Sequence, residues 1–146
     1  LHVRSRRQRQ MCIRDRDGRR LIYVYRRSAL GKVLQESEIQ KFLSDFGYVD
    51  FSPEAALAEL SRRFSEMTDA SASFPHEIGI FLGYPLADVR AFIVHRGKDA
   101  RLTGDWKVYD NEEEALQTFS LYADCREKLS ALFRQGHSLS ELSVCG

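Results

Sequence analysis

The spacing of apolar residues along the chain predicts one strand, a series of helices, a second strand and a long last helix. Residues 21–25 combine β-branched and aromatic side chains between arginines, which is typical of a strand. Residues 28–46 repeat apolar side chains at helical spacing, and we expect two helices there with a break near Glu36. Gly47 is a natural end for the second of them.

Ser52 and Pro53 predict the start of an amphipathic helix, because serine is a favoured N-cap and proline suits the first helical position. Apolar residues then recur at spacings of three and four, which places Arg62 and Arg63 on the outward face. The small and polar residues 68–73 predict a loop after this helix.

Residues 74–85 contain a predicted helix start, a charged pair and a helix stop within one short stretch. We expect Pro75 to open a helix that ends at Leu82. Gly83 permits the left-handed backbone that ends a helix, and Pro85 prevents its continuation. This density of signals indicates a shaped site, but it names no reaction.

The last third of the chain predicts a helix, a strand and a long helix. The first of these ends at Gly97 and is expected to turn Asp88 outward. Residues 106–109 predict the second strand. Asn111, with Glu114 three residues later, is a capping signature for the long helix. That helix is expected to run to about residue 134, with an apolar face made of Leu116, Phe119, Ala123, Leu129 and Phe133.

Together these elements predict an α+β fold, a helix-rich single domain with a small antiparallel sheet. Only two strands are clear, and an isolated pair of strands is marginally stable in water. We therefore expect residues 21–25 and 106–109 to pair with each other and to pack on the helices. A chain of about 130 residues is long enough to build one hydrophobic core.

Residues 1–16 differ from the rest of the chain, since they carry six arginines and one acidic residue without periodicity. One interpretation is a basic arm that binds nucleic acid. However, residues 6–15 can be encoded by bases that resemble a transposase-type adapter used in preparing DNA libraries. We therefore interpret residues 1–16 as a disordered, adapter-derived tail, and residues 17–146 as a domain that lacks its native N-terminal segment.

The charge balance argues against polyanionic partners. Without residues 1–16 the chain has 16 basic and 20 acidic residues, a net charge of −4 instead of +1. A mildly acidic domain lacks the positive surface that binds nucleic acids and anionic membranes, so we expect neither partner. No apolar run approaches the roughly 20 residues of a spanning helix. Without residues 1–16, Cys125 and Cys145 remain, and they form no C-x-x-C pair and no disulfide framework, which favours a reducing, cytoplasmic setting.

The sequence also lacks the common catalytic and metal-binding motifs. It contains no H-E-x-x-H, no phosphate-binding glycine loop and no G-x-S-x-G. His95 and His137 have no partner at ligand spacing, so we expect no metal site built by the protein. Cys125 lies beside the apolar stripe of the long helix and is expected to be a buried, inert thiol.

Two motifs stand in the middle of the chain, Pro75-His76-Glu77 and Leu82-Gly83-Tyr84-Pro85. They resemble the Pro-His-Glu and Leu-Gly-Tyr-Pro motifs of an uncharacterised bacterial family, the domain-of-unknown-function family 3793. The likeness extends to residues 18–26 and 104–109 and covers about residues 17–142. Members of that family carry a further segment at the front, often with a cysteine. The resemblance implies kinship and leaves the chemistry open.

His76 and Glu77 are the candidate catalytic residues. In the first turn of a helix opened by Pro75, the helix dipole favours a neutral imidazole and an ionised carboxylate. His76 could then accept or pass a proton, or the helix start could hold an anion. The structural alternative is that Glu77 caps the turn while His76 bonds to a neighbouring carbonyl.

Tyr84 and Trp106 are the candidate ligand-binding residues. Trp106 belongs either to the core or to the aromatic wall of a pocket for a flat ligand. Tyr84 either packs at the corner with its hydroxyl bonded to the backbone, or acts as a catalytic acid. The expected pocket lies between the helix that starts at Pro75 and the strand of Trp106.

Three functions remain open on the sequence alone. The favoured one is a module that binds a small molecule or cofactor, with His76 and Tyr84 as polar contacts. The second is an enzyme that uses His76 as a general base, with a nucleophile from the missing N-terminal segment. The third is an interaction scaffold in which the motifs only fix helix packing. The cofactor, the ligand and the oligomeric state are not determined by the sequence.

Overall fold

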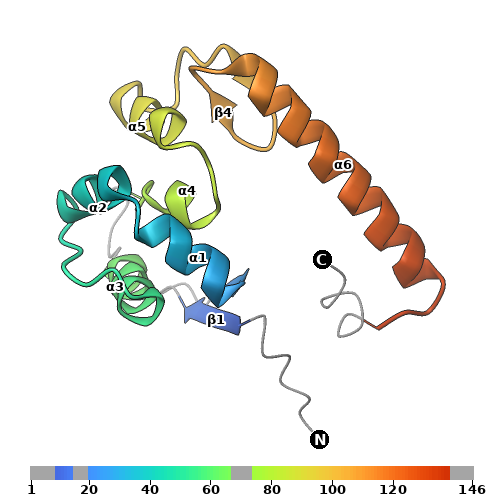
Figure 1. The fold of residues 1–146 in the computed structure, drawn as a ribbon, viewed down its shortest axis with the longest axis horizontal. Coiled ribbons are helices and arrows are strands. Elements are labelled where there is room, and N and C mark those ends of the chain that lie inside the picture. Colours follow the sequence, from blue (N-terminus) through green and yellow to red (C-terminus); the bar gives the residue numbers. More distant parts are fainter. Residues whose placement is uncertain (1–8, 15–19, 67–73, 139–146) are drawn as a thin grey trace, which may run out of the picture. The chain divides into compact units, whose positions relative to one another are not determined.

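The computed structural model describes residues 9–14, 20–66 and 74–138 (Figure 1). The fold is α+β, as predicted, and helices predominate. The loop expected at residues 68–73 lies outside the described residues. In chain order the elements are β1 (Arg9–Arg14), β2 (Arg20–Tyr25), α1 (Arg27–Leu34), α2 (Ser37–Ser44), α3 (Pro53–Ser65), α4 (Ile78–Phe81), α5 (Leu86–Val94), β3 (Leu102–Thr103), β4 (Lys107–Val108) and α6 (Glu112–Arg134).

The chain divides into two compact units, the first ending at Leu86 and the second beginning at Ala87. The first unit contains the elements from β1 to α4, and the second those that follow. The single domain expected for residues 17–146 stays a prediction.

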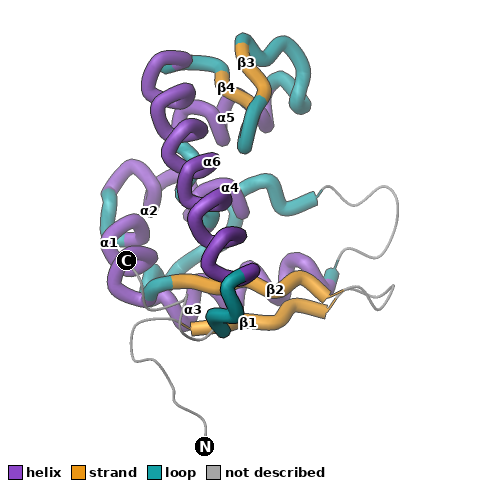
Figure 2. The backbone as a smooth tube through the Cα atoms, turned by 90° about the vertical axis from the view of Figure 1, so that its right-hand side faces the viewer, coloured by secondary structure: helices purple, strands orange, loops and turns teal. Residues whose placement is uncertain are grey.

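In the first unit β1 and β2 form an antiparallel sheet, with Arg9 opposite Tyr25 and Arg14 opposite Arg20 (Figure 2). β2 matches the strand expected from the sequence. β1 lies within residues 1–16, where we expect a disordered tail, so the structure departs from that expectation at residues 9–14. Strand pairing uses backbone groups, and a segment without strand periodicity can therefore still cover the edge of β2. The adapter origin of residues 1–16 stays a prediction.

Capping residues, a proline and a glycine begin and end the helices of the first unit as predicted. The helical run breaks at Glu36, which is the N-cap of α2, and it stops at Gly47, whose φ is 91°. The Ser52 side chain accepts a hydrogen bond from the Ala55 N–H at 3.4 Å, and Pro53 begins α3. The core of this unit consists of Leu30, Leu34, Ile39, Phe42, Leu43, Tyr48, Ala56, Leu57, Leu60, Phe64, Ile80 and Phe81.

The second unit contains a hairpin that we did not expect from the sequence. β3 pairs antiparallel with β4, so that Leu102 lies opposite Val108 and Thr103 opposite Lys107. The predicted pairing of residues 21–25 with residues 106–109 is therefore wrong, because these segments pair with β1 and β3 instead. The entropy cost of closing the short loop between β3 and β4 is smaller than that of joining distant segments.

α6 begins at the predicted cap. The Asn111 side chain accepts a hydrogen bond from the Glu114 N–H at 3.2 Å and donates one to the Glu114 carboxylate at 2.9 Å. The helix ends before Gly136, whose φ is 92°. Its predicted apolar face is only partly correct, since Leu116, Ala123, Leu129 and Phe133 are exposed. No helix in the described part of the chain is both long and apolar enough to cross a membrane.

Candidate functional site

The helix of the Pro-His-Glu motif begins later than the sequence predicts. α4 covers Ile78–Phe81, and Glu77 is its N-cap. The N–H groups of residues 78–80 each donate to the carbonyl three residues earlier, in a tight turn of the 3₁₀ type. These groups are therefore already bonded, and the anion site expected at the helix start loses its basis. Because α4 is a single turn, its dipole is also small.

The Leu-Gly-Tyr-Pro motif ends α4 as predicted. Gly83 has a φ of 82°, in the left-handed region that glycine adopts at little cost. Its N–H donates to the Ile80 carbonyl at 3.0 Å, and the N–H of Tyr84 donates to the Gly79 carbonyl at 2.9 Å. This pair of bonds is the Schellman motif. The glycine of the family motif is therefore explained by the geometry of a helix end.

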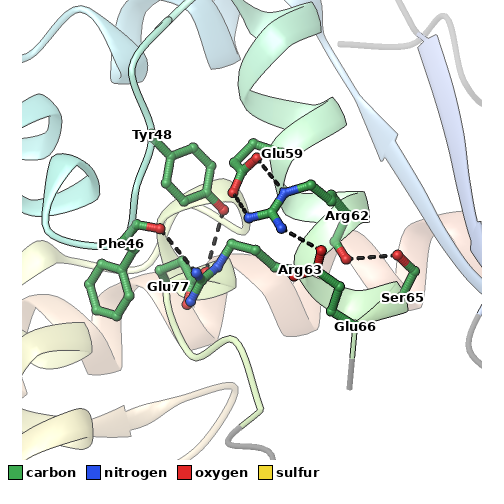
Figure 3. Close-up of polar contacts among 8 residues, drawn as sticks. All are labelled: Phe46, Tyr48, Glu59, Arg62, Arg63, Ser65, Glu66 and Glu77. Atoms are coloured by element: carbon green, nitrogen blue, oxygen red, sulfur yellow. Dashed lines mark hydrogen bonds and ion pairs between the residues drawn. The ribbon is translucent and has the colours of Figure 1, made fainter. Parts of the chain in front are cut away.

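Glu77 lies at the centre of a buried polar cluster formed with Arg63 and Tyr48 (Figure 3). Its Oε1 atom accepts from Nε of Arg63 in an ion pair, and from the Tyr48 hydroxyl at 3.4 Å. Its Oε2 atom is buried and has no hydrogen-bond partner among the described residues. The side chain makes no cap bond to α4, so the alternative of a capping carboxylate is wrong.

Arg63 turns inward, contrary to the sequence prediction. Its side chain is 27% exposed, whereas that of Arg62 is 52% exposed. Arg63 also donates from Nη1 to the Phe46 carbonyl at 3.0 Å, and its guanidinium carbon lies 5.5 Å from the centroid of the Phe46 ring. The signal for this orientation was present, because Arg63 follows Leu60 by three residues and borders the apolar stripe of α3.

Aromatic residues enclose the cluster and fix α4. The Tyr48 ring is buried and lies 6.0 Å from the Phe81 ring, between centroids. Burial, and then the charge of Glu77, raise the pKa of Tyr48 above its ordinary value, so its hydroxyl remains a neutral donor. From β2, the hydroxyl of Tyr23 donates to the Phe81 carbonyl. Contacts from distant parts of the first unit therefore hold both ends of this short helix.

His76 directly precedes Glu77 in the sequence, and Tyr84 follows the end of α4. Both side chains are half-buried. The His76 ring lies 5.4 Å from the ring of Phe74, between centroids. Three of the four predicted site residues, His76, Glu77 and Tyr84, thus belong to one corner of the first unit. The fourth, Trp106, belongs to the second unit. The pocket expected between Pro75 and Trp106 stays a prediction.

Trp106 is packed and hydrogen-bonded within its own unit. Its indole N–H donates to Oδ2 of Asp88 at 2.7 Å, and its ring meets the Phe119 ring edge-on at 4.5 Å. Oδ1 of Asp88 accepts from the N–H groups of Tyr109 at 2.8 Å and Asp110 at 3.2 Å. The prediction of an outward Asp88 is therefore wrong, because three donors compensate for the desolvation of its buried carboxylate.

The Phe119 ring lies directly against the backbone of Gly104. A Cβ atom on Gly104 would be 2.2 Å from Cε2 of Phe119, which is closer than atoms can approach. Gly104 and Trp106 are therefore both explained by packing between the hairpin and α6. Ligand contact by Trp106 stays a prediction, although its one polar atom is already bonded.

Candidate metal ligands do not gather in the described residues. No three side chains among His, Cys, Asp and Glu come together in residues 9–14, 20–66 and 74–138. Cys125 is exposed on α6, so the expectation of a buried thiol is wrong. Most of that helix lies at the surface, and the apolar spacing around Cys125 does not bury it.

Comparison with protein families gives a match over residues 2–143 to the family described as "Protein of unknown function (DUF3793)". The matched range contains both motifs and both units, and it also includes residues 2–16. No curated protein and no solved structure matches the chain.

Proposed function

Because the chain belongs to the DUF3793 family, whose description names no reaction, we propose its function from the corner around α4. We propose that the protein is a small-molecule-binding module, and that His76, Glu77 and Tyr84 contact the ligand. The cytoplasmic setting expected from the cysteine content belongs to the same proposal.

The main support for this proposal is Oε2 of Glu77, a buried carboxylate oxygen without a hydrogen-bond partner among the described residues. Nearly all buried polar atoms in native proteins have a hydrogen-bond partner, and an exception calls for an explanation such as a bound molecule. A buried ion pair is also weak evidence for a purely stabilising role, since apolar residues of similar volume often give equal stability. The Arg63–Glu77 pair therefore favours a role in binding over a role in packing alone.

Half-buried side chains on either side of Glu77 suit the same role. His76 and Tyr84 offer an imidazole and a phenol at the two ends of α4, and backbone hydrogen bonds form the turns around them. Preorganised polar groups lower the entropy cost of binding a ligand. Trp106 is a weaker candidate contact, because its N–H is bonded to Asp88 and its ring packs on Phe119.

The enzyme alternative has less support from the geometry. Oε1 of Glu77 already accepts from Arg63 and Tyr48, so this oxygen is not available to orient a base. An enzyme with His76 as general base, and an interaction scaffold, both stay predictions without an observation that favours them.

Native mass spectrometry of the purified chain tests the proposed function. We expect a small molecule to remain bound in the native spectrum and to be lost on denaturation. The Glu77→Gln variant should lose this molecule, whereas Glu113→Gln, at an exposed position on α6, should retain it. Protein that carries no ligand, and whose melting temperature no compound in a metabolite library raises, would contradict the proposal.

A further inference from the structure

The charge balance of the Glu77 cluster restricts the chemistry of the ligand. One carboxylate and one guanidinium meet at Oε1, and the remaining oxygen, Oε2, lacks a donor among the described residues (Figure 3). Any group that completes the cluster must therefore donate a hydrogen bond to Oε2. Ammonium, guanidinium, amide and hydroxyl groups can all do so, and only the charge of the group distinguishes them.

We propose that the ligand presents an uncharged hydrogen-bond donor, an amide N–H or a hydroxyl, to Oε2 of Glu77. This inference depends on the proposed function, because it names the chemical class of the group that the same site binds.

Arg63 already neutralises Glu77, so a cationic ligand group would leave an excess positive charge in a buried place. Like charges at close range are unfavourable, and more so where water is excluded. Arg63 cannot easily withdraw to make room, because it is also held by the Phe46 carbonyl and the Phe46 ring. An uncharged donor would complete the hydrogen bonding of Oε2 without this cost.

Tyr48 cannot supply a compensating negative charge. Its hydroxyl is the second donor to Oε1, and burial raises the pKa of this hydroxyl above its ordinary value. It therefore stays protonated at physiological pH and contributes a dipole, not a charge. Tyr48 therefore does not change the charge balance of the Arg63–Glu77 ion pair.

Two matched pairs of fragments test this inference. Benzamide and benzamidine have nearly the same shape but differ in charge, and benzyl alcohol and benzylamine form a second such pair. Each is titrated into the protein while amide NMR shifts of residues 76–80 are recorded. We expect each neutral compound to bind about tenfold or more tightly than its cationic partner, because a like charge beside Arg63 is unfavourable.

Arg63→Gln provides the sharper test, since it keeps a donor near Glu77 and removes the positive charge. In this variant the preference should invert in favour of benzamidine and benzylamine. Arg62→Gln is the matched control, because Arg62 is the more exposed neighbour and its partners are Glu59 and Glu66. It should retain the preference for neutral compounds.

The relative affinities of the four compounds for the wild-type protein test the inference even if Arg63→Gln does not fold. Tighter binding of the cationic compounds to the wild-type protein would overturn the inference and leave the proposed function standing. Saturable binding of none of the four at residues 76–80 would also overturn it. Failure of the proposed function itself is recognised separately, from a native spectrum without ligand.

Discussion

Trp106 donates its indole N–H to the buried carboxylate of Asp88 at 2.7 Å, which links α5 to the β3–β4 hairpin. The same carboxylate accepts two backbone N–H groups from the segment that precedes α6. One aspartate therefore satisfies three donors, one from the loop of the hairpin and two from the segment that follows it.

Asp88→Ala should destabilise the second unit by about 2–3 kcal/mol, because it leaves several buried donors without an acceptor. Trp106 is the only tryptophan of the chain, so its fluorescence during urea unfolding reports this loss directly. Asp110→Asn changes an exposed carboxylate nearby and should alter the free energy of unfolding by less than about 0.5 kcal/mol. Equal effects of the two variants would show that Asp88 does not have this role.

Gly104→Ala should destabilise the protein by about 1–3 kcal/mol, because the added methyl group overlaps the Phe119 ring. Gly31→Ala is the matched control. Its Cβ would meet Cγ of Pro53 at 3.6 Å, an ordinary contact, and Gly31 lies inside α1. It should therefore stabilise the protein by roughly 0.5–1 kcal/mol. Thermal unfolding followed by circular dichroism measures both, and a stabilising Gly104→Ala would refute the close packing of Phe119 on Gly104.

The Arg63–Glu77 pair should show strong coupling in a double-mutant cycle. Arg63→Met leaves a fully buried carboxylate without its cation and should cost about 3–5 kcal/mol. Glu77→Leu should cost less, because the Arg63 side chain is 27% exposed and keeps its hydrogen bond to the Phe46 carbonyl. The double variant should recover most of the loss, since it removes both charges together. Additive losses, measured by chemical denaturation, would mean that the two charges do not interact.

Stability should fall in strongly alkaline solution because of Tyr23. Burial, and then the neighbouring Tyr25, raise the pKa of Tyr23 from 10.0 to about 12. Below pH 10 its contribution is complete; between about pH 10 and 12 the unfolded chain loses the phenolic proton while the folded chain retains it. The unfolded state then binds fewer protons, so the free energy of unfolding decreases as the pH rises.

Melting temperatures recorded from pH 8 to pH 12 check this expectation, with tyrosinate absorbance as a second readout. Tyr23→Phe should reduce the decrease between about pH 10 and 12, because it removes one of the tyrosines whose pKa is raised on folding. Tyr122→Phe, at an exposed position on α6, should not change the slope. An identical pH profile for wild-type protein and Tyr23→Phe would contradict the raised pKa.

The sequence anticipated part of the candidate site. It singled out the segment from Pro75 to Pro85 and correctly predicted that Gly83 ends a helix there. It did not identify Arg63 or Tyr48 as partners of Glu77, since these lie 14 and 29 residues away along the chain. It also started the helix too early, because a proline at a turn and a proline at the first helical position carry the same local signal.

The sequence by itself determined the helix boundaries that depend on near neighbours. Ser52 and Asn111 cap their helices through an N–H three residues ahead, and Gly47 and Gly136 end theirs through their own backbone angles. Only the tertiary structure decided which strands pair and which charged side chains turn inward. A backbone edge accepts any extended segment, and a charge such as that of Asp88 or Glu77 is buried only where donors from elsewhere in the chain compensate for its lost hydration.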